Sequence, residues 1–270
     1  MSEAIDLEGQ VVVVTGGGRG VGRGISERFL EAGAEVVVCS RSRPESLPAA
    51  ADGQAAFVEC DVREPERIEA AVAEIASRYG RLDVLVNNAG GSPAAESATA
   101  SPRFSEAIVR LNLLAPLWFS QRAFAVMERQ AEGGCIINVA SVSGIRPSPR
   151  TAAYAAAKAG LLALTQTLAV EWAPKVRVNA VTAGLIRTEQ AHLHYGDEAG
   201  VASVGATVPL GRMGEPRDVG DACLFLASPL AAYVSGASLL VHGGGERPAF
   251  LGAARNVAPG GAAGGGKDGA

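Results

Sequence analysis

Two residues of one segment, Tyr154 and Lys158, have the side chains and the spacing for proton transfer. They stand four positions apart in TAAYAAAKAGLLALTQTL, which holds no other titratable side chain. In a helix this spacing places both on one face, a turn apart. A phenol loses its proton near pH ~10, and a neighbouring ammonium lowers that value by stabilising the phenolate. The pair could therefore exchange a proton near neutral pH, although the same pattern also occurs in helices without chemistry.

A glycine-rich turn near the start of the chain is the second feature with chemical meaning. The segment QVVVVTGGGRGVGRGISERFLEAGAEVVVCSRS reads as a buried strand, a glycine turn, a helix and a second strand. A helix that begins at such a turn points its backbone N–H groups at an anion. The glycines fit neither G-x-G-x-x-G nor the Walker pattern, but they fit T-G-x-x-x-G-x-G as Thr15, Gly16, Gly20 and Gly22. We therefore expect this turn, Val21 included, to bind a phosphate; the flanking strands disfavour a loop that binds nothing.

The elements that must position these residues alternate along the chain. The pattern predicts strands at 11–14, 35–40, 55–60, 83–87, 134–140, 176–182 and 237–242. It predicts helices at 20–31, 65–79, within 103–130, at 151–172 and at 216–227. Such alternation is typical of the α/β class, here a doubly wound parallel sheet of about seven strands with helices on both faces. Ligands of these sheets bind beyond the carboxyl ends of the strands.

Length and composition favour a single domain. The chain has 270 residues, of which 48% are hydrophobic, and no Pro-rich, Ser-rich or charged linker divides it. We expect one domain over 1–245 and a disordered, low-complexity tail over 246–270, which ends in GGAAGGGKDGA. The net charge of −4 gives no electrostatic reason to expect nucleic acid or an anionic membrane as a partner.

Several short motifs follow one another at regular places along the predicted elements. They are TGGGRGVG at 15–22, Asp61-Val62 after the third strand, Asn87-Asn88-Ala89-Gly90 after the fourth, Asn112 in a helix, Ser141 after the fifth strand, and Tyr154 with Lys158. On these motifs the chain resembles the short-chain dehydrogenase/reductase family from about residue 7 to residue 244. The resemblance implies a Rossmann-type fold and an oxidoreductase that acts on CH–OH groups with NAD(P)⁺ as acceptor.

The resemblance also implies catalytic roles for side chains of these motifs. Ser141 would polarise a substrate carbonyl, and Tyr154 would donate the proton to its oxygen or remove it in the reverse direction. Lys158 would lower the pKa of Tyr154 and bind the nicotinamide ribose. Asn112 would hold a water that relays protons to Lys158, whereas the plainer interpretation is an Asn that bends the helix before Pro116.

The end of the second strand bears on the choice between NADP(H) and NAD(H). A carboxylate there would accept hydrogen bonds from the adenosine ribose and repel a 2′-phosphate. This chain instead has Ser40, Arg41 and Arg43, with no acid until Glu45, and Arg19 lies in the glycine turn. Guanidinium groups pair with phosphate through two hydrogen bonds, and similar arginines mark NADP-preferring members of the family. We expect NADP(H) to be preferred, with NAD(H) left open; the alternative is that Arg41 and Arg43 are solvated loop charges.

The other adenosine contacts follow from the resemblance. Asp61 would accept a hydrogen bond from the adenine amino group, and Val62 would supply a backbone N–H. Small residues that allow close backbone approach would line the adenosine ribose. These are Asn88, Ala89 and Gly90.

The nicotinamide side is expected in NAVTAGLIRTE, after the sixth strand. The backbone at Gly184 and Ile186 and the hydroxyl of Thr188 would hold the carboxamide group. The family usually has Pro-Gly where this chain has Ala183-Gly184, so the loop loses a fixed φ angle. His242 stands where many relatives carry Asp, which we interpret as a structural difference.

Substrate contacts are expected from three segments, 91–99, 142–150 and 189–205. The last contains His192, His194 and Tyr195. A His-x-His pattern can bind metal, but no Cys or acidic cluster joins it nearby, so we expect no metal site. We interpret 189–205 as a long, mobile lid over a small carbonyl or alcohol substrate.

Cellular location and assembly are predicted from composition and resemblance. The widely spaced Cys39, Cys60, Cys135 and Cys223 read as reduced core residues. The acidic N-terminus is unlike a secretory signal, and the apolar run 152–170 contains Lys158, so we expect a soluble cytoplasmic protein. The family resemblance suggests a homotetramer, or a homodimer, that uses the helix at 151–172 and the long helix before it.

Two other functions stay open. A 3-oxoacyl thioester reductase of fatty-acid or polyketide synthesis would need a basic patch for an acidic carrier protein. The residues that could form one are Arg103, Arg110, Arg122, Arg146 and Arg150. A non-catalytic dinucleotide sensor would keep the glycine turn, but it would not need Ser141, Tyr154 and Lys158 together.

Overall fold

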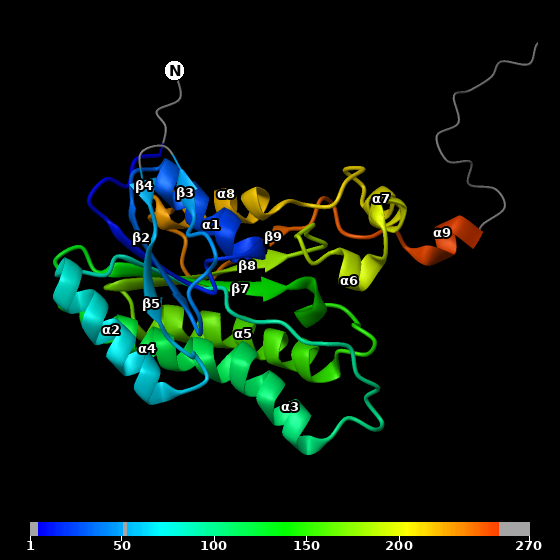
Figure 1. Cartoon of the computed structure of the whole chain (residues 1–270), viewed down its shortest axis with the longest axis horizontal. Helices are drawn as coiled ribbons and strands as arrows, with labels where there is room; N and C mark the ends of the chain where they lie inside the picture. Colours follow the sequence, from blue (N-terminus) through cyan, green and yellow to red (C-terminus); the bar gives the residue numbers. More distant parts are fainter. Residues whose placement is uncertain (1–4, 51–52, 254–270) are drawn as a thin grey trace, which may run out of the picture.

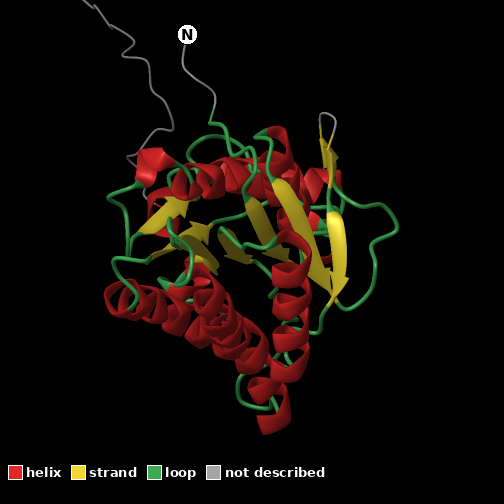
Figure 2. Ribbon diagram, turned by 90° about the vertical axis from the view of Figure 1, so that its left-hand side faces the viewer, coloured by secondary structure: helices red, strands yellow, loops and turns green. Residues whose placement is uncertain are grey.

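A seven-stranded sheet lies between two layers of helices in the computed structural model (Figures 1 and 2). The structure describes residues 5–50 and 53–253. The strands are β1 (Val11–Thr15), β2 (Glu35–Ser40), β5 (Ala56–Glu59), β6 (Val84–Asn87), β7 (Gly134–Ser141), β8 (Val176–Ala183) and β9 (Ser238–Val241). Their order is β5-β2-β1-β6-β7-β8-β9, and every neighbouring pair is parallel.

Helices cover both faces of this sheet. One face carries α1 (Gly20–Glu31) and α8 (Pro216–Ala227); the other carries α2 (Pro65–Tyr79), α4 (Ala115–Met127) and α5 (Ala152–Glu171). The elements α6 (His192–Tyr195), α7 (Glu198–Thr207) and α9 (Ala249–Ala253) lie beyond the carboxyl ends of β7 and β8 (Figure 1). Smaller elements are β3 (Ala49–Ala50), β4 (Gly53–Gln54), α3 (Pro102–Val109) and three short helical turns at 110–114, 142–144 and 229–231.

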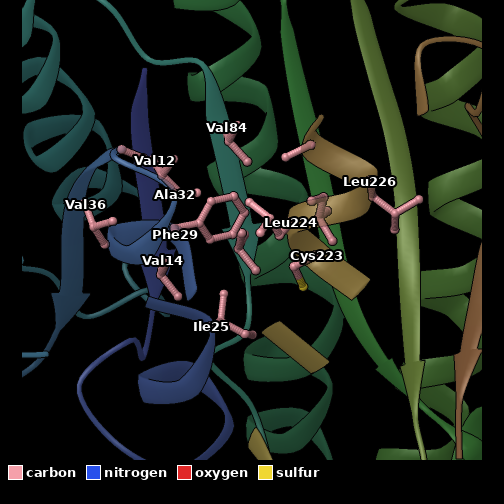
Figure 3. Packing of buried hydrophobic residues seen from close by; sticks show 14 of the residues in the cluster. Val12, Val14, Ile25, Phe29, Ala32, Val36, Val84, Cys223, Leu224 and Leu226 are labelled. Atoms are coloured by element: carbon pink, nitrogen blue, oxygen red, sulfur yellow. The ribbon is translucent and has the colours of Figure 1, made fainter. Parts of the chain in front are cut away.

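Alternation of the side chains along β1 divides the core in two. All five residues of β1 are buried. Val12 and Val14 face α1 and α8, where Ile25, Phe29 and Leu224 pack against them (Figure 3). Val11 and Val13 point to the opposite face and pack with residues of α2, α4 and α5. The valine run therefore forms a strand that is buried on both sides, as in other parallel sheets.

The sheet reverses its direction of growth between β1 and β6. From β1 the chain proceeds outward to β2 and β5, then crosses to β6 and proceeds outward again through β7, β8 and β9. At such a switch point the loops that follow neighbouring strands diverge and leave a crevice. The glycine turn after β1 and the Asn87–Gly90 motif after β6 border it.

The sequence-based fold is confirmed, with three differences. The long helix within 103–130 is interrupted by a π-helical turn at Arg110–Leu114, which separates α3 from α4. The short hairpin of β3 and β4 was not predicted. The segment 189–205 is not a long loop: it forms α6 and α7, anchored by an apolar cluster of Ala191, Val201 and Met213.

Part of the predicted tail is described. Glu246 forms an ion pair with Arg146, and α9 follows at 249–253. The remainder of the tail prediction, 254–270, lies outside the described residues. In the described ranges, no helix combines the length and the apolar character needed to cross a membrane.

Candidate active site

Ser141, Tyr154 and Lys158 converge at the carboxyl end of β7. Ser141 is the last residue of that strand, and α5 brings the other two residues alongside, one turn apart. Ser141 and the Tyr154 hydroxyl share a hydrogen bond. The backbone N–H of Ser143 donates to Ser141 Oγ at 3.2 Å, which fixes the serine side chain. The three side chains predicted to do chemistry therefore form one group.

Lys158 is a buried cation behind Tyr154. Its side chain is 3% exposed, and Nζ donates to the Val139 carbonyl oxygen at 2.7 Å. Nζ lies 5.7 Å from the centroid of the Tyr154 ring. Burial disfavours the ammonium and lowers the Lys158 pKa from 10.5 to about 8. Lys158 therefore loses its positive charge near pH 8, slightly above neutral pH.

In this arrangement the pKa of Tyr154 is raised overall, not lowered. Burial raises the pKa of Tyr154 above its usual value, and the hydrogen bond from Ser141 offsets only part of this effect. The hydroxyl therefore holds its proton at neutral pH. A tyrosine in this state is suited to donate a proton to a substrate oxygen rather than to remove one.

Replacing Lys158 by methionine is expected to stabilise the folded chain at neutral pH. Because the folded pKa lies below the unfolded one, unfolding takes up a proton between pH 8 and 10.5, and wild-type stability falls as the pH is lowered through this window. At pH 7 the buried charge destabilises the wild-type fold by about 2–4 kcal/mol. The variant also loses the hydrogen bond to Val139, so its net gain in stability is smaller by about 1 kcal/mol. Urea unfolding at pH 7 and pH 10.5 should show the advantage of Lys158→Met at the lower pH only.

Lys175→Met is the matched control for that measurement, because this lysine is exposed. Its substitution should leave the pH dependence of stability as in the wild type. A stability difference between Lys158→Met and wild type that is the same at both pH values would contradict the assignment of a buried, charged Lys158.

Asn112 occupies the π-helical turn between α3 and α4 and is fully buried. Its Nδ2 donates to the carbonyl oxygens of Gly91 (3.0 Å) and Ile108 (2.9 Å), and its Oδ1 accepts from the Gly91 N–H (2.9 Å). A Cβ at Gly90 would lie 2.7 Å from Asn112 Oδ1 and 3.4 Å from Lys158 Nζ. Asn112 thus clamps the loop after β6, and only glycine fits between it and Lys158. Its part in a water relay stays a prediction.

The glycine turn has the conformation that its spacing predicts. Gly16 and Gly20 have φ angles of 64° and 51°, in the left-handed region that favours glycine. Gly22 is required for a different reason: a Cβ there would lie 2.3 Å from the carbonyl oxygen of Gly16. The Asn88 side chain closes the turn by donating to the carbonyl oxygen of Thr15 at 2.9 Å. The turn therefore places the N-terminus of α1 next to the loop after β6.

A cleft of about 960 Å³ runs along the carboxyl ends of the strands. Every residue predicted to bind the cofactor lines it: Gly16, Arg19, Gly20, Val21, Gly22, Ser40, Arg41, Asp61, Val62, Asn88, Ala89, Gly90, Tyr154, Lys158, Gly184, Ile186 and Thr188. Ser141 also lines the cleft. The sequence motifs, distant along the chain, thus border one continuous space.

Positive charge surrounds one end of this cleft. Arg19 and Arg41 are exposed, and within residues 5–50 and 53–253 neither forms an ion pair. Arg43 lies over the Phe57 ring, 5.8 Å from its centroid. Arg23 donates to the backbone and the hydroxyl of Ser46 and so ties the loop after β2 to α1. Two exposed guanidinium groups at this end are therefore not held in a close ion pair within the described ranges, although the charge of Arg41 acts on the Asp61 carboxylate.

Arg63 is a cleft residue that the sequence motifs did not single out. Its guanidinium donates to both oxygens of the Asp61 carboxylate, and its backbone N–H donates to Oδ1 at 3.0 Å. These contacts hold the pKa of Asp61 below its usual range. Asp61 is therefore ionised and fixed, with lone pairs left for an amino group. The sequence signal available for this contact was the opposite charge of Asp61 and Arg63, two positions apart. That spacing does not predict the loop conformation that brings the two side chains together.

Two of the three predicted substrate segments, 91–99 and 189–205, contribute residues to the lining of the cleft, and the third, 142–150, does not. The loop 91–99 is joined to the loop 142–150 by the Ala95 N–H, which donates to the Arg150 carbonyl oxygen (2.8 Å), and by the Arg150–Glu96 ion pair (3.0 Å). Tyr195, at the end of α6, lines the cleft. The described residues bring together no group of three or more His, Cys, Asp or Glu side chains suited to hold a metal ion.

Comparison with known proteins gives a consistent result. A family model described as enoyl-(acyl carrier protein) reductase matches residues 16–246. L-fucose dehydrogenase of Oryctolagus cuniculus is 37% identical over 255 residues, which cover 91% of this chain and 88% of that protein. The 3-oxoacyl-[acyl-carrier-protein] reductase FabG of Vibrio cholerae is 37% identical over 243 residues, covering 89% and 98%. The ligand-free aldohexose dehydrogenase of Thermoplasma acidophilum superposes with a TM-score of 0.82 at 31% identity, covering 93% and 97%.

Proposed function

The chain belongs to the short-chain dehydrogenase/reductase family, and from this premise we propose that it is an NADP(H)-dependent oxidoreductase that interconverts an alcohol and a ketone or aldehyde. The observation that carries the proposal is the hydrogen-bonded Ser141–Tyr154 pair with Lys158 one turn behind it. This group borders the same cleft as the glycine turn. Proton transfer and dinucleotide binding are thus provided side by side.

The residues of the cleft fit a dinucleotide phosphate. The N-terminus of α1 directs N–H groups into the cleft, and Gly20 leaves room for close approach to that helix end. At the end of β2, Ser40 and Arg41 replace the carboxylate that would repel a 2′-phosphate. Arg19 and Arg41 form no close ion pair among the described residues, which supports NADP(H) over NAD(H).

When bound, the nicotinamide ring supplies a hydride to the carbonyl carbon or accepts one from the alcohol carbon. Ser141 donates a hydrogen bond to the carbonyl oxygen and holds it against Tyr154. The Tyr154 hydroxyl gives its proton to that oxygen during reduction and takes it back during oxidation. Lys158, positively charged below about pH 8, stabilises the tyrosinate that remains. Asn112 holds the loop that carries Gly90. Because Gly90 has no side chain, this loop can lie close to Lys158.

The carrier-protein alternative has support from the similarity to FabG but less from the surface. Of the five arginines that could form a docking patch, three are paired: Arg122 with Glu69, Arg146 with Glu246 and Arg150 with Glu96. Arg110 lies over the Trp118 ring. Neutralised arginines attract an acidic partner weakly. A small free carbonyl compound is therefore the substrate class that we propose.

A panel of substrates tests the function. The purified chain is supplied with NADPH or NADH and with ketones, aldehydes, sugars and 3-oxoacyl thioesters, and cofactor oxidation or reduction is followed. We expect turnover of at least one carbonyl class with NADPH. Activity confined to 3-oxoacyl thioesters would select the carrier-protein alternative, and turnover of none of these compounds with either cofactor would contradict the proposal.

We also propose a homotetramer that uses α5. The exposed side of this helix carries Ala152, Ala156, Ala163 and, 80% exposed, Val170. We expect sedimentation at micromolar concentration to give about four times the chain mass of 27.4 kDa. Ala163→Glu should reduce the mass by placing charges in the contact, whereas Ala199→Glu, on exposed α7, should not. A wild-type monomer would contradict this assembly.

The proposed location is the cytoplasm. Cys39, Cys60, Cys135 and Cys223 are all free thiols and all buried. Unpaired cysteines of this kind are typical of proteins from reducing compartments.

A further inference from the structure

The carboxylate of Glu189 lies on the N-terminus of α1. Its Oε1 accepts a hydrogen bond of 3.0 Å from the backbone N–H of Gly20, the first residue of the helix. The helix has no acidic residue in its own first turn, and its N-cap residue Arg19 makes no side-chain cap. In the described part of the chain, Glu189 is the one side chain that accepts from this turn. A carboxylate distant in sequence thus accepts from one N–H group of this helix end.

The backbone around Glu189 is ordered by local hydrogen bonds. The Ala191 N–H donates to the Thr188 carbonyl oxygen at 3.0 Å, and the His192 Nδ1 lies 2.9 Å from the Glu189 carbonyl oxygen. The helix α6 begins directly afterwards and ends at Tyr195, which lines the cleft. The contact with Gly20 therefore fastens the start of the segment 188–195 to the glycine turn.

The same N–H group lies at the helix end where the phosphates of the proposed cofactor would bind. In the proposed function, the phosphates of the dinucleotide bind at the N-terminus of α1. Gly20 has one N–H, so the Glu189 carboxylate and a phosphate oxygen cannot both accept from it. Two anions at hydrogen-bond distance from one donor would also repel each other. A phosphate oxygen that accepts from Gly20 therefore requires the exposed Glu189 side chain to turn away.

We propose that Glu189 is an internal competitor for the cofactor pyrophosphate and that it sets the affinity of this site. The inference rests on the proposed function, because it assumes that NADP(H) is the ligand. When the phosphates displace the carboxylate, the contact that fastens segment 188–195 to the glycine turn is lost. Cofactor binding is thereby coupled to the position of Tyr195 at the mouth of the cleft.

Calorimetric titration with NADPH tests this competition without a turnover measurement. Glu189→Ala removes the competing carboxylate, so the Kd for NADPH should fall about tenfold, the amount expected for one charge-assisted hydrogen bond. Glu189→Gln keeps a neutral acceptor and should lie between wild type and Glu189→Ala. Glu189→Asp keeps the charge but is one methylene shorter, so it should lose most of the contact and also bind NADPH more tightly than wild type.

The matched control is Glu198→Gln, which removes one negative charge from the neighbouring α7, where Glu198 pairs with Arg187. It should leave the Kd for NADPH within about twofold. A second probe is adenosine 2′-monophosphate, which lacks the pyrophosphate; its Kd should be the same in wild type and Glu189→Ala. Equal tightening of both ligands, or an effect of Glu198→Gln as large as that of Glu189→Ala, would overturn the competition.

The outcomes separate this inference from the proposed function. If wild type binds neither NADPH nor NADH and converts no carbonyl compound, the proposed function fails. If wild type binds NADPH and both Glu189→Ala and Glu189→Gln bind it no more tightly, only the inference fails. Circular dichroism of each variant shows that the fold is retained.

Discussion

Replacing Tyr154 by phenylalanine is expected to lower turnover at least ~10²-fold, the loss typical for a general acid. The substitution keeps the ring in the cleft and removes only the hydroxyl that shares a hydrogen bond with Ser141. Without that proton donor, the alkoxide that develops on the substrate has no acid in contact with it. Cofactor affinity should change little, since the ring and Lys158 stay in place. Steady-state kinetics at saturating substrate, together with NADPH titration, measure both effects.

The matched control is Tyr79→Phe, at the end of α2 and away from the cleft. It makes the same chemical change and should keep turnover within about twofold, as expected for a substitution that touches no part of the site. If Tyr154→Phe kept more than about a tenth of wild-type turnover, Tyr154 would not be the acid, because loss of a general acid costs more than that.

Replacing Arg41 by aspartate is expected to shift the cofactor preference toward NADH. If Arg41 faces the adenosine 2′-phosphate, the variant exchanges a charge-assisted hydrogen bond worth ~1.5–3 kcal/mol for repulsion, so kcat/KM for NADPH should fall more than ~10-fold. The new carboxylate can accept from the ribose hydroxyls, so kcat/KM for NADH should be unchanged or improved. Arg19→Asp should act in the same direction but more weakly. Both cofactors are measured on wild type and on each variant.

Arg129→Asp provides the control, because Arg129 is exposed just after α4 and the substitution changes the net charge by the same amount. It should alter neither value, so a general electrostatic effect can be recognised. A wild type that already prefers NADH, or an unchanged cofactor ratio in Arg41→Asp, would leave Arg41 as a solvated surface charge.

The elements around the glycine turn could be predicted closely because each boundary has a local cause. The valine run of β1 ends where glycines begin, and α1 covers residues 20–31 as its pattern indicates. The π-helical turn at Asn112 was not predicted, because no local motif marks an extra residue in a helical turn. Asn112, within this turn, contacts Gly91 from a loop 21 residues away in sequence.

The segment 189–205 shows a different limit of sequence patterns. We interpreted it as a mobile lid, because long loops with few apolar anchors often have that role. In the structure Ala191 and Val201 pack against Met213, which comes from a later part of the chain, and this contact supports α6 and α7. Tertiary packing therefore decided the local structure, as it often does for short helices.

The pKa values of the site residues depend on burial, which the sequence motifs do not indicate. The Tyr-x-x-x-Lys spacing correctly brings the two side chains together, but the sequence suggested a lowered Tyr154 pKa. The structure buries Lys158 to 3% exposure, so that the lysine itself has the lowered pKa and Tyr154 keeps its proton. Contacts such as Glu189 with Gly20 were likewise invisible, because the pair is separated by 169 residues.

Deuteride transfer tests the central claim most directly. NADPH in which both hydrogens at the reactive carbon of the nicotinamide ring are replaced by deuterium is incubated with the chain and the best carbonyl substrate of the panel, and the alcohol is analysed by mass spectrometry. If the cleft delivers hydride from NADPH while Tyr154 delivers the proton, the alcohol carries deuterium on its carbinol carbon, and Tyr154→Phe forms this product at least ~10² times more slowly. An alcohol without deuterium, or labelled product formed at the wild-type rate by Tyr154→Phe, would contradict the account.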